Sequence, residues 1–190
     1  MVRKKREWYA GAKYHIMCRG NHRNDLFRDE EDYQVYLNIL KEIKEKIEYE
    51  IYCYCLMTNH VHMVIETGEI SIGNIMKRIN MIYSIYFNKK YNLIGHLFQD
   101  RYRSELIEED KYILEVSRYI HLNPVRANMV KKPEDYEWSS YSMLIGLSKE
   151  KIINSQKILS YFRTGKNRER YRNFVESGIK IKMKEDEEVV

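Results

Sequence analysis

Alternating apolar and polar positions predict four β-strands. Residues 14–19 repeat with a period of two, which is typical of a strand whose two faces differ. One face carries Tyr14, Ile16 and Cys18, and the other carries His15, Met17 and Arg19. The run 51–57 is apolar on both faces and predicts a central strand. A short turn at 58–59 joins it to a strand over 60–66, so the two form a hairpin, and a last strand is expected over 97–107.

A period near 3.6 residues predicts two helices between these strands and a third after the last strand. The first begins at Asp29, where acidic side chains favour the positive helix N-terminus, and Ser71 can cap the second. Their apolar stripes are Tyr33, Tyr36, Leu37, Leu40, Ile43 and Ile47, then Ile72, Ile75, Met76, Ile79, Tyr83 and Phe87. The third helix starts at Asp110 and is expected to end near Pro124, because the residue before a proline resists helical geometry.

The resulting order, β-α-β-β-α-β, is that of a ferredoxin-like fold. We therefore expect an α+β protein with an antiparallel sheet, followed by a further helix. The simplest division is one compact domain over 1–145 and a basic, helical C-terminal extension over 146–190. Within the extension, 149–160 and 166–177 have helical and basic character.

Composition narrows the class of protein. A chain of 190 residues can bury a core without disulfides, and its three cysteines argue against a disulfide framework. No apolar run approaches the ~20 residues of a membrane span, and the basic start is followed by no signal-like apolar stretch. We expect a cytoplasmic protein without a membrane partner. The net charge of +5 and the 13% of aromatic residues suit either nucleic-acid binding or an ordinary tyrosine-rich core edge.

Two histidines are the first candidate for chemistry. His60 and His62 stand on the same face of the predicted strand, roughly 6.5 to 7 Å apart along it. Imidazoles at that separation can converge on one metal ion. The alternative is a pair of polar histidines at a strand edge.

The helix over 110–123 is the second candidate. Tyr112, Val116, Tyr119 and Asn123 fall on one face, and Tyr119 and Asn123 are one i,i+4 step apart. A phenol beside an amide could serve as nucleophile and third metal ligand. Alternatively, Tyr119 packs in the core, and Asn123 is an N-cap with Pro124 at the first helical position.

Basic side chains suited to phosphate contacts lie on or near these elements. The candidates for DNA binding are Arg19, Arg23, Lys77, Arg78, Arg101, Arg103 and Arg126. A basic arm over 3–6 and a tail cluster could add to them; the tail cluster is Arg163, Lys166, Arg168, Arg170 and Arg172. For the arm and the tail, a solvated surface is the alternative to DNA contact.

Several motifs together resemble one family. The stretch Met57-Thr58-Asn59-His60-Val61-His62 resembles the metal-binding strand of HUH single-strand endonucleases, in which U is a bulky apolar residue. Arg118-Tyr119-Ile120-His121-Leu122-Asn123-Pro124-Val125-Arg126-Ala127 resembles the nucleophile helix of REP-associated tyrosine transposases, which are insertion-sequence transposase-like enzymes. The stretches 14–21, 26–27, 98–102 and 138–141 also resemble motifs of that family, and their order and spacing agree with it over roughly residues 8–145.

The resemblance implies a metal-dependent enzyme that cleaves and transfers single-stranded DNA beside a hairpin. It implies Tyr119 as the nucleophile that forms a 5′-phosphotyrosine, with His60, His62 and Asn123 holding Mg²⁺ or Mn²⁺. Many relatives carry glutamine where this chain has Asn123. Asparagine is shorter, so the resemblance supports direct metal coordination by Asn123 less strongly than coordination by the two histidines. Tyr112 is the alternative nucleophile, but Val116 stands where its amide partner would be.

Three readings therefore remain open at this point. Besides the tyrosine transposase, the same fold could bind structured RNA or DNA without chemistry, or could act as a metal-dependent phosphodiesterase that activates water. The resemblance also leaves the oligomeric state open. In a swapped homodimer, Tyr119 of one chain could serve the histidines of the other.

Overall fold

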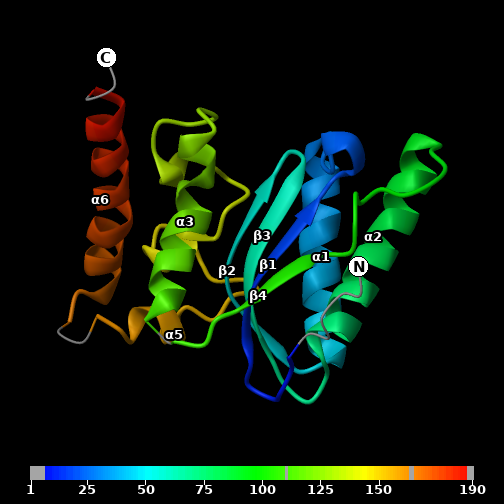
Figure 1. Ribbon diagram of the computed structural model, residues 1–190, viewed down its shortest axis with the longest axis horizontal. Helices are drawn as coiled ribbons and strands as arrows, with labels where there is room; N and C mark the ends of the chain where they lie inside the picture. Colours follow the sequence, from blue (N-terminus) through cyan, green and yellow to red (C-terminus); the bar gives the residue numbers. More distant parts are fainter. Residues whose placement is uncertain (1–6, 110, 163–164, 188–190) are drawn as a thin grey trace.

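A four-stranded antiparallel sheet forms the centre of the molecule (Figure 1). The protein is seen here in a computed structural model that describes residues 7–109, 111–162 and 165–187. The strands are β1 (Lys13–Arg19), β2 (Tyr49–Met57), β3 (His60–Thr67) and β4 (Arg103–Leu106), in the spatial order β2-β3-β1-β4. Every neighbouring pair is antiparallel. This is the predicted α+β, ferredoxin-like arrangement, which is thereby confirmed.

Helices cover both faces of the sheet, as Figure 1 shows. Helices α1 (Glu30–Lys46) and α2 (Ile72–Tyr91) lie on one side, and α3 (Tyr112–Arg126) lies on the other side against β2 and β3. Helix α6 (Asn167–Glu187) packs on the outer side of α3. The short elements are η1 (Asn21–Arg23), η2 (Pro133–Asp135), α4 (Tyr141–Leu144) and α5 (Gln156–Leu159). None of the helices in the described ranges is long and apolar enough to span a membrane.

The alternation in β1 divides its side chains between these two layers. Cys18 points to the α1/α2 side, where its Sγ lies 3.8 Å from the Asn80 Oδ1 of α2. His15 points to the α3 side, where its ring contacts the ring of Tyr119. The apolar residues Tyr14, Ile16 and Cys18 thus enter the main core, and the opposite face is left for polar groups.

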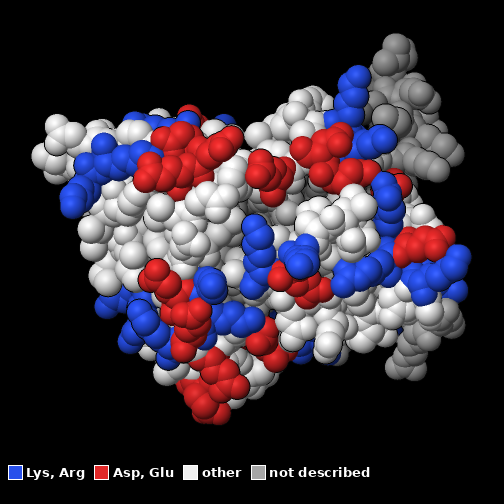
Figure 2. All heavy atoms as spheres, turned by 180° about the vertical axis from the view of Figure 1, so that it is seen from behind, with Lys and Arg blue, Asp and Glu red and all other residues white. Residues whose placement is uncertain are grey.

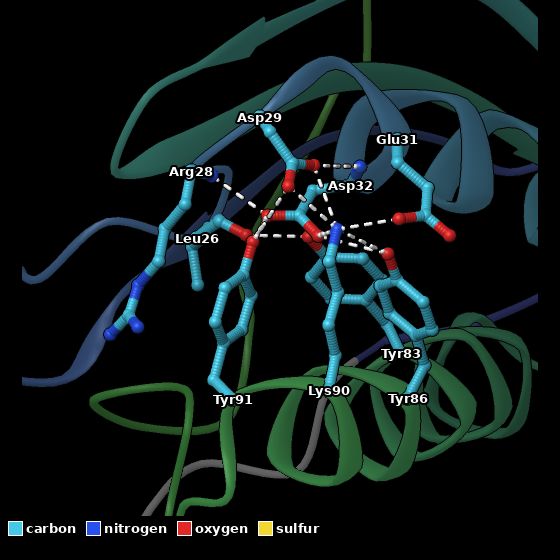
Figure 3. A network of polar contacts seen from close by, with 9 residues as sticks. All are labelled: Leu26, Arg28, Asp29, Glu31, Asp32, Tyr83, Tyr86, Lys90 and Tyr91. Atoms are coloured by element: carbon cyan, nitrogen blue, oxygen red, sulfur yellow. Dashed lines mark hydrogen bonds and ion pairs between the residues drawn. The ribbon is translucent and has the colours of Figure 1, made fainter.

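A polar network fastens α1 to α2 at one end of the sheet (Figure 3). Asp32 is fully buried, and its carboxylate accepts hydrogen bonds from Lys90 Nζ at 3.0 Å, Tyr86 Oη at 2.9 Å and Tyr91 Oη at 2.8 Å. Asp29 caps α1, since its side chain accepts from the Asp32 backbone N–H, and it also pairs with Lys90. The buried carboxylate is therefore fully partnered, as burial of a charge requires.

The last strand is shorter than expected. Pairing between β1 and β4 covers only Arg103–Leu106, and residues 97–102 are irregular. An unbroken ladder would place residue 100 opposite Gly20, whereas Phe98 is its partner. The chain therefore loops out around residues 99–102, and the strand predicted over 97–107 is wrong for its first half. The extra residues are the ones that form one wall of the site described below.

Helix α3, predicted over 110–123 with its end near Pro124, continues three residues beyond that range. It runs on to Arg126 with the proline inside its last turn. Proline costs the helix one hydrogen bond to the residue four earlier, but here it is buried and only half a turn follows, so little helix is lost. Asn123 is consequently not an N-cap, and that alternative is wrong. The predicted start, Asp110, lies outside the described residues.

The C-terminal segment packs through α6. Tyr171 and Val175 are fully buried, and the Tyr171 hydroxyl donates to Ser117 Oγ of α3 at 3.1 Å. Only 156–159 of the segment 149–160 is helical, whereas α6 extends well beyond residue 177. The domain division at residue 145 stays a prediction.

Candidate active site

The α3-facing side of the sheet carries an open cavity of about 780 Å³. Its floor is formed by β1 and β3, one wall by the irregular segment before β4, and another by α3. It is lined by Met17, Cys18, Arg19, His60, His62, Gln99, Asp100, Arg101, Tyr102, Arg103, Ser104, Tyr119 and Asn123. The cavity thus brings together the predicted nucleophile, the three predicted metal ligands and three of the predicted DNA-binding arginines.

His60 is held in one ring orientation by its neighbour. Its Nδ1 lies 2.6 Å from Asn59 Oδ1, and Asn59 Nδ2 in turn donates to the Arg23 carbonyl at 3.3 Å. Because the Asn59 oxygen can only accept, His60 Nδ1 carries the proton. The lone pair on its Nε2 is then available to bind a metal ion.

His62 is paired with a histidine that the sequence analysis left unassigned. His62 Nδ1 lies 3.0 Å from the Nε2 of His15, and both side chains are buried. The two rings stack with centroids 5.3 Å apart, and His62 also meets His60 edge to face at 5.0 Å. The sequence feature that could have identified His15 is its position on the same face of β1 as Arg19. Its partner His62 lies 47 positions away, and only the register of the strands brings the two histidines together.

Burial keeps these imidazoles neutral. Desolvation, with a smaller contribution from Arg19, lowers the pKa of His60 to about 4. Desolvation followed by the neighbouring His60, His15 and Arg19 lowers the pKa of His62 to about 3, and desolvation also lowers the pKa of His15 despite the nearby Glu105. Near neutral pH each imidazole is therefore neutral and has one nitrogen with a free lone pair. The neutral imidazole is the form that binds metal ions.

The Tyr119 side chain, on α3, contacts the rings of His15 and His62. Its ring meets His62 at a centroid distance of 5.6 Å and His15 at 5.9 Å, both nearly perpendicular. The residue is 40% exposed, and the Arg126 guanidinium lies 5.3 Å from its ring centroid. Tyr112 is also exposed but is not among the residues that line the cavity. Tyr119 and the histidines meet within one chain, and the homodimer stays a prediction.

Asn123 lies one turn beyond Tyr119 and lines the same cavity. Its Nδ2 donates to the Tyr119 carbonyl at 3.2 Å. The amide oxygen, the atom that could bind a metal ion, is thus not used in this bond. The helix geometry that was predicted to place phenol and amide side by side is present.

The donor set suits a divalent ion. Among the described residues, no three His, Cys, Asp or Glu side chains cluster as a metal site. The predicted ligands in this cavity are two imidazoles and one amide oxygen, those of His60, His62 and Asn123. Such a set leaves coordination positions open for phosphate oxygens. Mixed nitrogen and oxygen ligands favour Mn²⁺ over Mg²⁺, which prefers oxygen alone.

The predicted basic residues divide into four groups. Arg19, Arg101 and Arg103 line the cavity, and Lys77 lines a neighbouring cavity of about 610 Å³ that shares residues 99–102 as its wall. Arg126 reaches the Tyr119 ring. Arg23 and Arg78 are exposed and line neither cavity.

The tail cluster is largely occupied by contacts within the chain. Arg168 pairs with Glu150 at 3.0 Å and also donates to the Leu144 carbonyl, and Arg172 pairs with Glu134 and Glu176. The basic arm over 3–6 and Arg163 lie outside the described residues. Figure 2 shows basic side chains interspersed with acidic ones across the rear face, so the described surface there has no continuous basic area.

Comparison with known proteins places this architecture among transposases. A family model described as "Transposase IS200 like" matches residues 9–123. A protein of Haemophilus influenzae, provisionally named a REP-associated tyrosine transposase, is 27% identical over 114 residues, which cover 53% of this chain. The chain matches 64% of the length of that relative, less than two thirds of it.

Two solved structures match part of the chain. One is a REP-associated tyrosine transposase bound to a REP hairpin, with a TM-score of 0.67 and 19% identity, covering 80% of this chain and 90% of that one. The other is a provisionally named transposase of Deinococcus radiodurans, with a TM-score of 0.44 and 18% identity, covering 63% of this chain and 95% of that one. At these identities the first likeness establishes the shared fold.

Proposed function

The chain belongs to the IS200-like transposase family, and we propose that it is a metal-dependent enzyme that cleaves and rejoins single-stranded DNA beside a hairpin through Tyr119. The observation that carries the proposal is the position of this phenol. It lies against His62 and beside Asn123, in a cavity lined by three arginines. The solved transposase of the same fold is bound to a REP hairpin, which supports a DNA hairpin as the partner.

The chain's own residues can bind and orient the strand. Arg19, Arg101 and Arg103 neutralise backbone phosphates as the strand enters the cavity. His60 and His62, through Nε2, and Asn123, through its amide oxygen, would hold a divalent ion. A bound Mg²⁺ or Mn²⁺ would supply Lewis-acid polarisation of a non-bridging phosphate oxygen and would help to orient the phosphate for in-line attack.

Tyr119 then supplies the nucleophile. Its Oη forms a bond to phosphorus while the bond from phosphorus to the 3′ oxygen breaks, which leaves a 5′-phosphotyrosine and a free 3′-OH. The phenolic proton leaves to solvent, and the departing 3′ oxygen takes one up. Arg126 stabilises negative charge that develops on the phenol. The phosphodiester energy is kept in the new bond, so a second 3′-OH can reverse the step without ATP.

Matched tyrosine variants test this proposal. We expect Tyr119→Phe to bind a hairpin-bearing single strand normally and to lose Mn²⁺-dependent cleavage, because only the hydroxyl is removed. Tyr112→Phe, on the same helix but outside the cavity, should cleave like the unchanged protein. If hairpin binding occurs without cleavage in the unchanged protein, the fold is serving as a binding module. If Tyr119→Phe still cleaves, the nucleophile is water or another residue.

A further inference from the structure

His15 is a buried histidine to which the proposed mechanism assigns no role. It is only 6% exposed, lies on β1 and contacts His62. Its Nε2 is 3.0 Å from His62 Nδ1, and its other nitrogen, Nδ1, is 3.8 Å from Glu105 Oε2 of β4. His15 and Glu105 are direct cross-strand partners, so their side chains share one face of the sheet.

The hydrogen bond between the two histidines can exist in two senses, and they differ in what His62 can do. If His62 Nδ1–H donates to His15 Nε2, the Nε2 of His62 keeps a lone pair. If His15 Nε2–H donates to His62 Nδ1, the Nε2 of His62 carries a proton and cannot bind a metal ion. The direction of one hydrogen bond therefore decides whether His62 is a competent ligand.

Glu105 favours the first sense. When His15 accepts at Nε2, its own proton sits on Nδ1, facing the Glu105 carboxylate. In the opposite sense, a lone pair on His15 Nδ1 would face that carboxylate, which is electrostatically unfavourable. A carboxylate behind a histidine is the usual device for fixing the tautomer of a metal-binding imidazole. Here it acts through a second histidine.

We propose that His15, oriented by Glu105, is a positioning residue that holds His62 in its Nδ1–H tautomer with Nε2 free for a metal ion. The proposal rests on the proposed metal-dependent function. Its parallel is His60, whose Nδ1–H is held by Asn59. The two expected ligands are thus set in the same protonation state by different neighbours, one through the β2–β3 turn and the other through β1 and β4.

The first test uses the metal-free protein. In ¹⁵N-edited NMR of the unchanged full chain near pH 7.5, we expect the His62 signals of an Nδ1–H tautomer. In His15→Leu the same ring should lose that preference, while His15→Gln, whose amide oxygen can accept from His62 Nδ1–H, should restore it. A His62 ring that is Nε2–H in the unchanged protein would overturn the proposal. This result does not depend on whether the protein cleaves DNA.

The second test measures Mn²⁺ binding by calorimetry, again without DNA. His15→Leu should bind Mn²⁺ about 10- to 100-fold more weakly, the usual loss when an outer hydrogen-bond partner of a ligand is removed. His15→Gln should recover most of the affinity. Glu105→Gln should weaken binding in the same direction by less, since Glu105 is 59% exposed, and the exposed Glu108→Gln is the charge-matched control.

Folding is the remaining control for these variants. Glu105 lies at the surface, so its variant keeps the proposal testable even if His15→Leu unfolds. Unchanged Mn²⁺ affinity in folded His15→Leu, or equal effects of Glu105→Gln and Glu108→Gln, would overturn the positioning role. Absence of Mn²⁺ binding in the unchanged protein, with the His62 tautomer as expected, would instead overturn the proposed metal-dependent function.

Discussion

Acid should destabilise this protein through a buried histidine of α3. His121 is fully buried on the far side of α3 from Tyr119. Its Nδ1 lies 2.7 Å from the Tyr171 hydroxyl of α6, and its Nε2 lies 3.0 Å from Ser140 Oγ, which also bonds the β2 backbone. This network fastens α3 to the layers on either side of it, so its loss would loosen the helix that carries Tyr119.

The size of the effect follows from the pKa of that imidazole. Burial lowers the pKa of His121 from 6.5 to about 3, so the folded protein resists the proton that the unfolded chain accepts. The stability contributed by neutral His121 is therefore fully present above pH 6.5 and is lost as the pH falls toward 3. At roughly 1.4 kcal/mol per pH unit, lowering the pH from 7 to 5 should reduce the free energy of unfolding by about 2 kcal/mol through this residue.

Urea unfolding at pH 7 and pH 5 measures this contribution, with His121→Gln as the comparison. The variant should be less stable at pH 7, because it loses part of a buried hydrogen-bond network, by about 1 to 3 kcal/mol. Its further loss between pH 7 and pH 5 should be about 2 kcal/mol smaller than that of the unchanged protein. Other buried histidines contribute equally to both proteins and cancel. Identical pH dependence in the two proteins would refute the reasoning.

Three further predictions concern binding and stability. His62→Ala should abolish Mn²⁺-dependent cleavage while hairpin binding persists, as gel shift and cleavage assays on one sample can show; undiminished cleavage would remove His62 from the site. Arg101→Ala should make the plot of log K against log salt shallower by about 0.7, the contribution of one phosphate contact on a single strand. Arg168→Ala should leave that slope unchanged, because Arg168 is already paired within the chain; the reverse pattern would place the DNA on the tail. Lys90→Met should lower the free energy of unfolding by about 3 to 5 kcal/mol in urea unfolding, because Asp32 would keep a buried charge without its cation. A loss below about 1 kcal/mol would mean that the hydroxyls of Tyr86 and Tyr91 are enough to stabilise the Asp32 carboxylate.

Periodicity predicted much of the fold because the elements around the main core each bury one face. Helices α1 and α2 and the β2–β3 hairpin begin and end within a few residues of the expected positions. The irregular stretch before β4 escaped prediction because its apolar residues are buried by loop packing rather than by a ladder, as for Tyr102. Pro124 misled the prediction of the end of α3 because tertiary burial outweighs a local penalty there.

The site was predictable only as far as local spacing reaches. A spacing of two residues along a strand places His60 beside His62, and a spacing of one helical turn places Tyr119 beside Asn123. The register of β1 against β3 and β4 is a long-range property, so the contacts of His15 with His62 and Glu105 could not be read from the sequence. The same holds for the pairs Arg168–Glu150 and Arg172–Glu134, whose members lie 18 and 38 positions apart.

A search for a covalent bond between Tyr119 and DNA is the most direct test of the proposed function. A hairpin-bearing single strand labelled on the 3′ side of the cleavage site is incubated with the protein and Mn²⁺, denatured, and separated by gel electrophoresis. We predict a labelled protein that withstands denaturation, with the nucleotide mapped to Tyr119 by peptide mass spectrometry, and no such adduct for Tyr119→Phe. Cleavage without any labelled protein, or a label on Tyr112, would contradict the account.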